Sequence, residues 1–451
     1  MDYFNLKFHN TTVKSEIFAG ISLFMAMSYI LVVCPSVLSE AGMDYNGVFI
    51  ATVIVSGVTT IISAFYTKLP IAFAPGLGLA SMFLSLATGP NRLHWSSLLL
   101  ATYMSGILLC AFVKFGLFDK IMEIMDVGFR RMIMSGVGFA LFLYGISTTG
   151  LLVKKEEIYV FGKIDIFPIV ICVVSLFIMY LLKKRNAKGY ILIGLLVAFF
   201  MSLCGDYYES YQATGISVGK YLQDVLEISY SFSDVKNVML TFPYVIDVFS
   251  DKENLAVFIN AVFVFTMGHF FDAIGTNTSS FDAINDNIDL RVKETVSLKR
   301  AINVDGMGGI ISGLVGTSSV TTYAESLVGI VSGGKTGITA ITTGCLFLLC
   351  FFFAPLFTYM PTYVAAPALV YVGLALTLRF REFDRSKKVP FVFGLCLIAY
   401  MGITFNMGNA VLYGLIIYTI IKMILEKEKP VRKWWIVLIF AAVHIWLNYI
   451  V

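Results

Sequence analysis

The chain of 451 residues is poor in charge, because only 14% of its residues are Asp, Glu, Lys or Arg. A soluble globular domain carries about 25% charged residues, so this composition argues against one. Lys and Arg total 33 against 29 acidic residues, a bias too small to indicate nucleic-acid binding. Disorder is excluded as well, since 58% of the residues are hydrophobic and 15% are aromatic. What remains is a membrane protein with short basic loops.

Residues that build disulfide frameworks or metal centres are also scarce. The seven cysteines all lie in apolar stretches, and no two of them have CxxC spacing. The four histidines, at positions 9, 94, 269 and 444, are too scattered for a His-rich site. No nucleophile–base arrangement or cofactor motif is present either. We therefore expect neither an enzyme nor a bound metal or cofactor.

Long apolar runs, in contrast, are abundant. A membrane-spanning helix needs about 20 apolar residues. Fourteen runs of suitable length fall into two sets of seven, separated by a polar stretch at 206–251. They lie near 17–35, 47–66, 71–88, 96–117, 130–152, 165–182, 189–205, 254–274, 301–315, 318–333, 337–358, 361–378, 389–405 and 408–425. The sequence therefore predicts an all-α polytopic membrane protein with about 14 transmembrane segments.

The distribution of Lys and Arg predicts the orientation of these segments. With a cytoplasmic N-terminus, most of the 33 basic residues fall on the cytoplasmic side, as in most membrane proteins. The acidic loop 206–251 then lies outside. A final apolar run at 434–451 is either a fifteenth span or an interfacial helix anchored by Trp434 and Trp435.

Two runs differ from ordinary spans, and each is the third of its set of seven. The run LPIAFAPGLGLASMFLSLATGP contains Pro70, Pro75, Gly76 and Gly78, and GLVGTSSVTTYAESLVGIVSGG begins with small polar residues. Each is predicted to be an extended segment followed by a half-helix; a merely kinked span is the alternative. A matched pair of interrupted segments indicates the binding site of a transporter near the middle of the membrane.

Two acids within the predicted spans are candidates for function, because a charge in a membrane span costs about 2.5–3.5 kcal/mol. Asp272 lies near the inner end of the eighth run, and Glu325 starts the second half-helix. The alternatives are a boundary residue for Asp272 and a helix cap for Glu325. His269 shares a helical face with Asp272 and could form a proton relay with it, or be an interfacial histidine.

Side chains beside these acids suit a flat polar ring with nitrogens and carbonyls. Hydroxyl groups offer hydrogen bonds and phenylalanines could stack on the ring, although most of the 39 phenylalanines must face lipid or the core. The candidates are Thr276, Ser318, Ser319, Thr321, Thr322, Phe270 and Phe271.

Five ordered motifs resemble the purine-permease (AzgA-like) branch of the nucleobase–cation symporters. They are EIFAGISLFMAMSYILVVCPSVLSEAGM, IAFAPGLGLA, FFDAIGT, GTSSVTTYAES and GIVSGGKTGITA. Their order and spacing match that branch from about residue 15 to residue 425. Four positions depart from its pattern: Ala80 stands where the branch has Asn, His269 where it has Asp, Ala273 where it has Thr and Lys335 where it has Arg.

The resemblance implies a seven-plus-seven inverted repeat like that of uracil transporters, with spans 3 and 10 discontinuous and containing short extended segments. A core domain that carries the substrate would comprise residues 1–116 (spans 1–4) and 252–358 (spans 8–11). A gate domain would comprise residues 117–251 (spans 5–7 and the extracellular loop) and 359–451 (spans 12–14 and the C-terminal apolar segment).

The candidates chosen from the residues above, together with those that the resemblance implies, give the predicted site. Substrate would be bound by Asp272, Glu325, Phe271, Thr276, Thr322, Tyr323, Gly76, Gly78, Ala80 and Ser81. Proton coupling would involve Glu325, Asp272 and His269, with the proton rather than sodium as the coupling ion and no cofactor.

We therefore expect a secondary active transporter that imports guanine, hypoxanthine or adenine by proton symport with an elevator-type mechanism. The alternative is a carrier of the same fold for xanthine, uracil or a small anion. The expected location is the plasma or inner membrane, with the lipid bilayer as surroundings, no nucleic-acid partner and a homodimer through the gate domain.

Overall fold

The computed structural model describes residues 2–89, 92–116, 127–155, 158–162, 165–185, 187, 190–214, 234–239, 252–287, 298–323, 325–353, 361–383, 388–404, 407–425, 434–435, 438–439 and 442. The loop predicted at 206–251 and the apolar run at 434–451 lie largely outside these residues.

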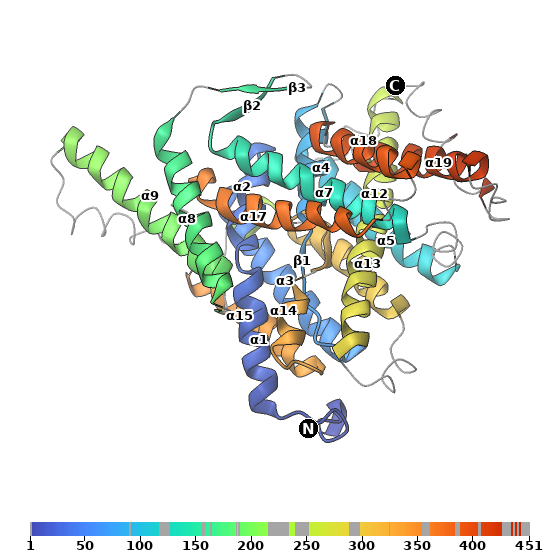
Figure 1. Ribbon diagram of the computed structural model, residues 1–451, viewed down its shortest axis with the longest axis horizontal. Coiled ribbons are helices and arrows are strands. Elements are labelled where there is room, and N and C mark those ends of the chain that lie inside the picture. Colours follow the sequence, from blue (N-terminus) through green and yellow to red (C-terminus); the bar gives the residue numbers. More distant parts are fainter. Residues whose placement is uncertain are drawn as a thin grey trace.

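Helices account for most of the described chain, as expected for an all-α protein (Figure 1). They are α1 (Val13–Met27), α2 (Ile30–Glu40), α3 (Tyr45–Thr67), α4 (Leu77–Thr88), α5 (Trp95–Lys114), α7 (Val127–Thr148), α8 (Ile166–Lys184), α9 (Tyr190–Thr214), α12 (Lys252–Asn287), α13 (Leu298–Val315), α14 (Ser326–Val331), α15 (Gly337–Leu349), α17 (Ala366–Thr377), α18 (Lys388–Thr404) and α19 (Met407–Leu425). Short strands pair as β1 (Phe73–Pro75) with β4 (Val320–Thr322) and as β2 (Leu152–Lys155) with β3 (Ile158–Phe161).

Several helices have the length and composition to cross a membrane. Among the described residues, five stretches of 18 or more residues qualify: Val13–Glu40, Tyr45–Thr67, Trp95–Lys114, Arg131–Thr148 and Ile166–Lys184. Seven shorter apolar helices accompany them. On α8, Ile166, Val173 and Phe177 are exposed by 71%, 60% and 59%. Such a row of exposed apolar side chains is stable when it faces lipid instead of water.

Polar side chains define where many of the helices begin. Thr12 accepts a hydrogen bond from the backbone N–H of Ser15 at the start of α1. Asp44 caps α3 with a 2.7 Å bond from Gly47, and Asp165 and Thr336 cap α8 and α15 in the same way. Each cap satisfies one of the backbone donors that a helix leaves unpaired at its N-terminus.

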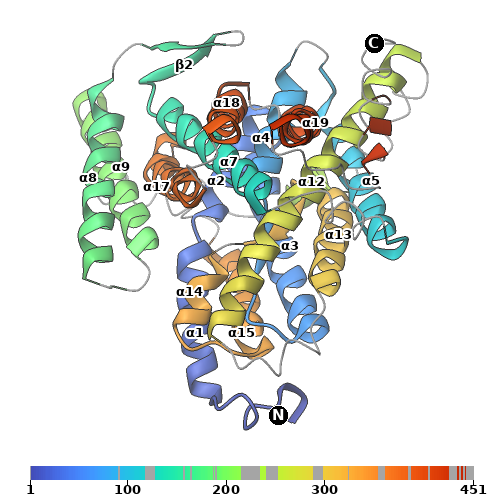
Figure 2. The ribbon, with the colours of Figure 1, turned by 45° about the vertical axis from the view of Figure 1, so that its right-hand side comes forward.

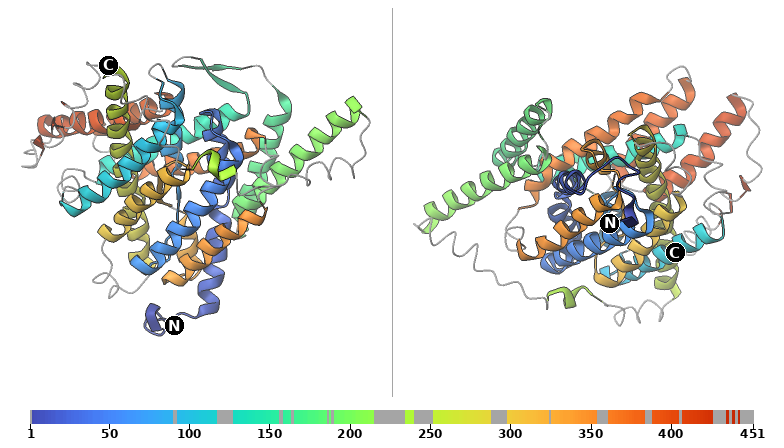
Figure 3. Two further views of the ribbon diagram at one scale, coloured as in Figure 1. Left: turned by 180° about the vertical axis from the view of Figure 1, so that it is seen from behind. Right: turned by 90° about the horizontal axis from the view of Figure 1, so that it is seen from below.

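The helices pack in two groups (Figure 2). The first group contains α1–α5 and α12–α15, and within it α3 packs on α15 and α5 packs on α13 (Figure 3). The second group contains α7, α8, α9, α17, α18 and α19, with α17 and α18 packed on α7. The groups meet where α12 contacts α19 and α7, where α4 contacts α7 and where α1 contacts α9.

Glycines allow the closest helix crossings of the first group. A Cβ atom on Gly106 of α5 would lie 2.5 Å from the backbone nitrogen of Ile310 in α13. A Cβ atom on Gly57 of α3 would lie 2.5 Å from the Leu348 side chain of α15. Small residues at such crossings let helix backbones approach closely in a membrane, where van der Waals packing drives association.

A buried carboxylate holds the start of α15. Glu16 of α1 is fully buried and accepts hydrogen bonds from the backbone N–H groups of Lys335 and Thr336, at 3.1 and 3.2 Å. The hydroxyl of Thr339 donates a third bond of 2.6 Å. The residues GGKTGIT therefore have a structural task here, because they present backbone donors to an acid on a neighbouring helix.

Replacing Glu16 should weaken the first helix group. Glu16→Ala removes the carboxylate to which Lys335, Thr336 and Thr339 donate, and the last two are buried, so we expect a loss of about 3 kcal/mol in unfolding free energy. Glu16→Gln keeps one acceptor oxygen and should lose less. Thermal unfolding of the purified variants in detergent measures both, and equal stability of Glu16→Ala and the unmodified protein would contradict the prediction.

Candidate substrate-binding site

Two extended segments meet inside the first helix group, and each leads into a helix. β1 and β4 are antiparallel, with Phe73 opposite Thr322, Ala74 opposite Thr321 and Pro75 opposite Val320. Just outside the ladder, Gly76 N–H donates to Ser319 O and Tyr323 N–H donates to Ala72 O. α4 begins after β1 at Leu77, and α14 begins after β4 at Ser326. Both segments predicted to be extended are thus extended and paired with each other.

Side chains of neighbouring elements bond to further backbone groups in β1 and just before it. The Thr60 hydroxyl of α3 donates to Phe73 O at 3.0 Å, and Phe73 N–H donates back to the same hydroxyl at 2.9 Å. The Ser326 hydroxyl of α14 accepts from Ala72 N–H at 3.0 Å. Non-helical backbone at membrane depth is stable when protein groups replace the missing helical bonds in this way.

Polar residues on one side of α12 contact successive residues of the extended segment 319–322. His269 lies 3.0 Å from Val320 O through Nε2 and 3.0 Å from the Ser319 hydroxyl through Nδ1. The Val320 carbonyl only accepts, so Nε2 is the donor. His269 is fully buried, and its two nitrogens are committed to Val320 of β4 and to Ser319 just before it. These contacts favour a role in holding the strand over a proton relay with Asp272.

Asp272 lies one turn further along α12 and is partly exposed. The Thr321 side chain hydrogen-bonds its carboxylate. A Cβ atom on Gly76 would lie 3.0 Å from Asp272 Oδ2, so the carboxylate sits directly against the turn into α4. Glycine at position 76 therefore leaves room for the acid beside the first half-helix. Asp272 is the member of this polar side of α12 that is placed to reach a ligand.

A second acid, Asp305 of α13, holds the far end of β4. It accepts from Thr322 N–H at 2.7 Å and from the Asn277 side-chain amide at 2.5 Å. The Thr322 hydroxyl donates to the Asn277 carbonyl oxygen at 2.9 Å. All three residues are fully buried, so this network has no access to solvent. It serves to fix β4 in place.

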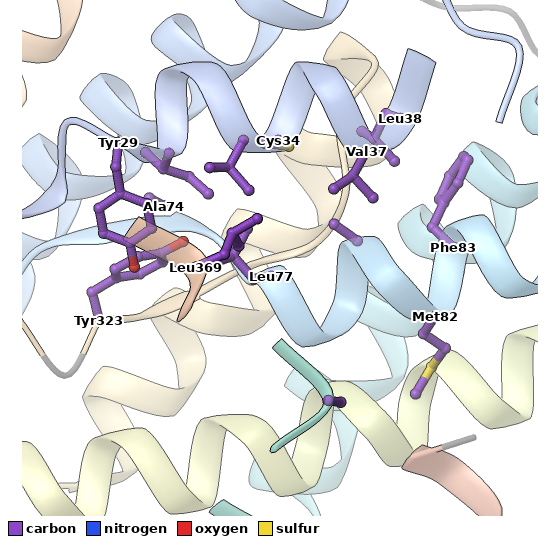
Figure 4. Packing of buried hydrophobic residues seen from close by; sticks show 14 of the residues in the cluster. Tyr29, Cys34, Val37, Leu38, Ala74, Leu77, Met82, Phe83, Tyr323 and Leu369 are labelled. Carbon is purple, nitrogen blue, oxygen red and sulfur yellow. The ribbon is translucent and has the colours of Figure 1, made fainter. Parts of the chain in front are cut away.

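Glu325 precedes α14 and is partly buried. Its Oε1 accepts a 2.8 Å bond from the Tyr29 hydroxyl, which comes from the junction of α1 and α2. The neighbouring Tyr323 donates a 2.6 Å bond to Pro75 O, the last residue of β1. Figure 4 shows the two tyrosine rings beside Ala74, with Leu77 of α4 and Leu369 of α17 close by in the same apolar cluster.

The predicted site residues of α4 surround its first turn. Gly76 and Ala80 are buried, whereas Gly78 is partly exposed. Ser81 donates its hydroxyl to Leu77 O at 2.9 Å within the same helix. The proton of this hydroxyl is therefore committed within α4. The helix backbone is described at Phe271 and Thr276, but their side chains lie outside the described residues.

The sequence reasoning missed three residues that the structure brings to this site: Tyr29, Asn277 and Asp305. Asp305 lies inside the apolar run 301–315, so the cost of a charge in a membrane span, which indicated Asp272, could have indicated Asp305 as well. Tyr29 lies in the quoted motif that begins EIFAGIS, but nothing in that motif specifies its partner. Among the described residues, no three His, Cys, Asp or Glu side chains group as metal ligands.

Comparison with known proteins identifies the family. The permease family Xan_ur_permease matches residues 14–412. The chain belongs to this family. It is therefore a permease and an integral, multi-pass membrane protein, and not an enzyme. The resemblance to purine permeases is confirmed by the named relatives of this permease.

Those relatives match over most of their length. The chain is 29% identical to the adenine permease AdeQ of Escherichia coli (strain K12), covering 93% of this chain and 90% of the relative. It is 28% identical to the guanine/hypoxanthine permease GhxP of Escherichia coli O157:H7, with coverages of 91% and 88%. It is 26% identical to the guanine/hypoxanthine permease PbuO of Bacillus subtilis (strain 168), with coverages of 97% and 98%.

Solved structures share the fold of this permease. The transmembrane domain of the cyanobacterial bicarbonate transporter BicA matches with a TM-score of 0.62 at 15% identity, covering 89% of this chain and 96% of that one. SLC26A9 matches with a TM-score of 0.59 at 12% identity, covering 93% and 66%. At these identities the likeness concerns the fold alone.

The two acids that contact β4 should respond differently to the same change. Asp305→Asn replaces an acceptor carboxylate by an amide, whose NH2 group is a donor and cannot accept from Asn277 or Thr322. We therefore expect the unfolding free energy to fall by about 3 kcal/mol. Asp272→Asn, at the partly exposed acid, should cost less than about 1 kcal/mol. Thermal unfolding of both variants without added ligand measures the contrast. Similar losses would show that Asp305 does not hold the strand.

Proposed function

We propose that this permease imports purine nucleobases, namely guanine, hypoxanthine or adenine, together with protons across the cell membrane. The observation that carries the proposal is the meeting of β1 and β4, which brings the partly exposed Asp272 and the partly buried Glu325 to one buried crossing point. The names of the relatives support purines as the substrate class.

The chemistry of the crossing point suits a purine ring. Purines carry ring N–H groups, and the carboxylates of Asp272 and Glu325 are acceptors for such donors. The first backbone N–H groups of α4 have no partner within the helix and are donors for ring nitrogens or carbonyl oxygens. The hydroxyls of Thr322 and Ser81 donate to protein groups, so we assign these residues a structural role and not direct contact with the ligand.

We propose an elevator-type mechanism for the movement. The first helix group would be the core domain, residues 1–116 and 252–358, and the second the gate domain, residues 117–251 and 359–451. The interruption of spans 3 and 10 by β1 and β4 supports a fourteen-span, seven-plus-seven inverted repeat, as do the matching contacts of α3 with α15 and of α5 with α13. The core would slide along the gate with the ligand bound.

For the coupling step, we assign the proton to Asp272 or Glu325 and give His269 a positioning role. The two acids are partly accessible, whereas His269 is fully buried with its nitrogens bonded to Val320 and Ser319. The N-terminus would be cytoplasmic, and two copies would associate through the gate domain.

An anion carrier is the second candidate, because the transmembrane domain of a bicarbonate transporter has the same fold. Two carboxylates at the crossing point oppose it, since they would repel a bound anion. Uptake of bicarbonate or sulfate that purines do not inhibit would favour this candidate over the purine proposal.

Glu325 should be needed for purine binding. Adenine, guanine or hypoxanthine at a hundredfold excess over its dissociation constant should stabilise the purified permease by about 2.7 kcal/mol. Glu325→Gln removes a charged acceptor, so we expect the dissociation constant to rise at least about tenfold. The control is Asp44→Asn, the same chemical change at an exposed helix cap where Asn caps equally well. Unchanged binding by Glu325→Gln would contradict this assignment.

Uptake should depend on a proton gradient. In proteoliposomes that are more acidic outside than inside, labelled purine should accumulate above its external concentration. A protonophore should abolish the accumulation, and a sodium gradient alone should not restore it. Equal uptake with and without the pH gradient would contradict proton symport and leave the purine assignment intact.

A further inference from the structure

The first membrane-length helix is interrupted at Ser28 and Tyr29, between α1 and α2. Here Leu31 N–H bonds to Ser28 O, and Val32 N–H bonds to Tyr29 O, which is the tighter three-residue pattern. Pro35 lies one turn further and cannot donate a bond to the carbonyl of Leu31. The chain is therefore irregular on both sides of Tyr29: tighter bonds lie at the junction itself, and a missing helical bond lies at Leu31 in the first turn of α2.

Tyr29 points from this interruption to the second half-helix. It is 1% exposed, and its hydroxyl donates a 2.8 Å hydrogen bond to Glu325 Oε1. Its ring centre lies 6.5 Å from that of Tyr323, whose own hydroxyl bonds to Pro75 O (Figure 4). The phenol therefore approaches Glu325 from a fixed, buried direction.

We propose that Tyr29 is a positioning residue that holds the carboxylate of Glu325 in the orientation in which it receives the substrate. This inference rests on the proposed function of Glu325 and names the residue that prepares it. A hydroxyl is suited to the task, because it donates to a carboxylate without cancelling its negative charge. A Lys or Arg at position 29 would instead form an ion pair and compete with a ligand.

The contact lies within one packing group. α1 packs against α14 and α15, and α2 packs against α4 and β1. If the first group moves as a unit against the second, the bond between Tyr29 and Glu325 persists throughout the transport cycle. Its loss should then weaken substrate binding and raise KM, with little change in the maximal rate.

The test is a double-mutant cycle on purine binding. The dissociation constants of adenine and hypoxanthine are measured on the purified permease, on Tyr29→Phe, on Glu325→Gln and on the variant with both changes. We expect Tyr29→Phe to weaken binding about tenfold, which corresponds to about 1.4 kcal/mol. In the Glu325→Gln background the same change should matter less than about twofold, because the charged acceptor is already gone.

Tyr418→Phe provides the matched control. Tyr418 is a buried tyrosine on α19, stacked on Phe129, and lies outside the site. Its hydroxyl is removed in the same way, and we expect its binding constant and KM to equal those of the unmodified permease. Uptake kinetics add a second readout: Tyr29→Phe should raise KM about tenfold at a nearly constant maximal rate, whereas damage to folding would lower the maximal rate and leave KM unchanged.

The outcomes separate this inference from the proposed function. If the unmodified permease binds neither purine, the proposed function fails. If it binds, and Tyr29→Phe binds equally well or loses tenfold in both backgrounds, Tyr29 does not act through Glu325 and only the positioning role is overturned.

Discussion

The antiparallel pairing of β1 with β4 is the constraint on which the site depends. A backbone interruption inside a membrane leaves N–H and C=O groups that water cannot reach, and each must find a protein partner. Each strand supplies those partners to the other, through the ladder from Phe73 to Pro75 and the added bond from Gly76 to Ser319. The two interruptions therefore depend on each other, and both half-helices start at the same place.

The polar residues around this pair divide by what they bond. His269, Asn277 and Asp305 are fully buried, and they bond to β4 or to one another. Asp272 and Glu325 also have protein partners, but both remain partly accessible. A fully buried group that bonds to a strand is not available to a ligand, so accessibility separates the supporting residues from the proposed binding residues more clearly than residue type does.

The sequence was sufficient to predict the helical membrane class and an extended segment in each of the two runs that contain β1 and β4. Asp272 and Glu325, the acids that it indicated, remain predicted binding residues. Apolar runs and Pro–Gly clusters report on local structure, and an acid within an apolar run is costly wherever it lies. The partner of a side chain, in contrast, depends on tertiary contacts, which local sequence patterns do not report. Thr322 and Ser81 have hydroxyls that suit a ligand, yet they bond to Asn277 and Leu77. Tyr29 and Glu325 are 296 positions apart, and only the folded chain brings them together.

The fold shared with a bicarbonate transporter does not fix the substrate, because function resides in the site. In this permease the two accessible groups at the crossing point are carboxylates held by neutral donors, Thr321 for Asp272 and Tyr29 for Glu325. Neutral donors orient an acid and leave its negative charge in place, which suits the N–H-bearing ring that we propose as the substrate and opposes an anion. On this proposal, one fold serves different ligands through the choice of a few side chains.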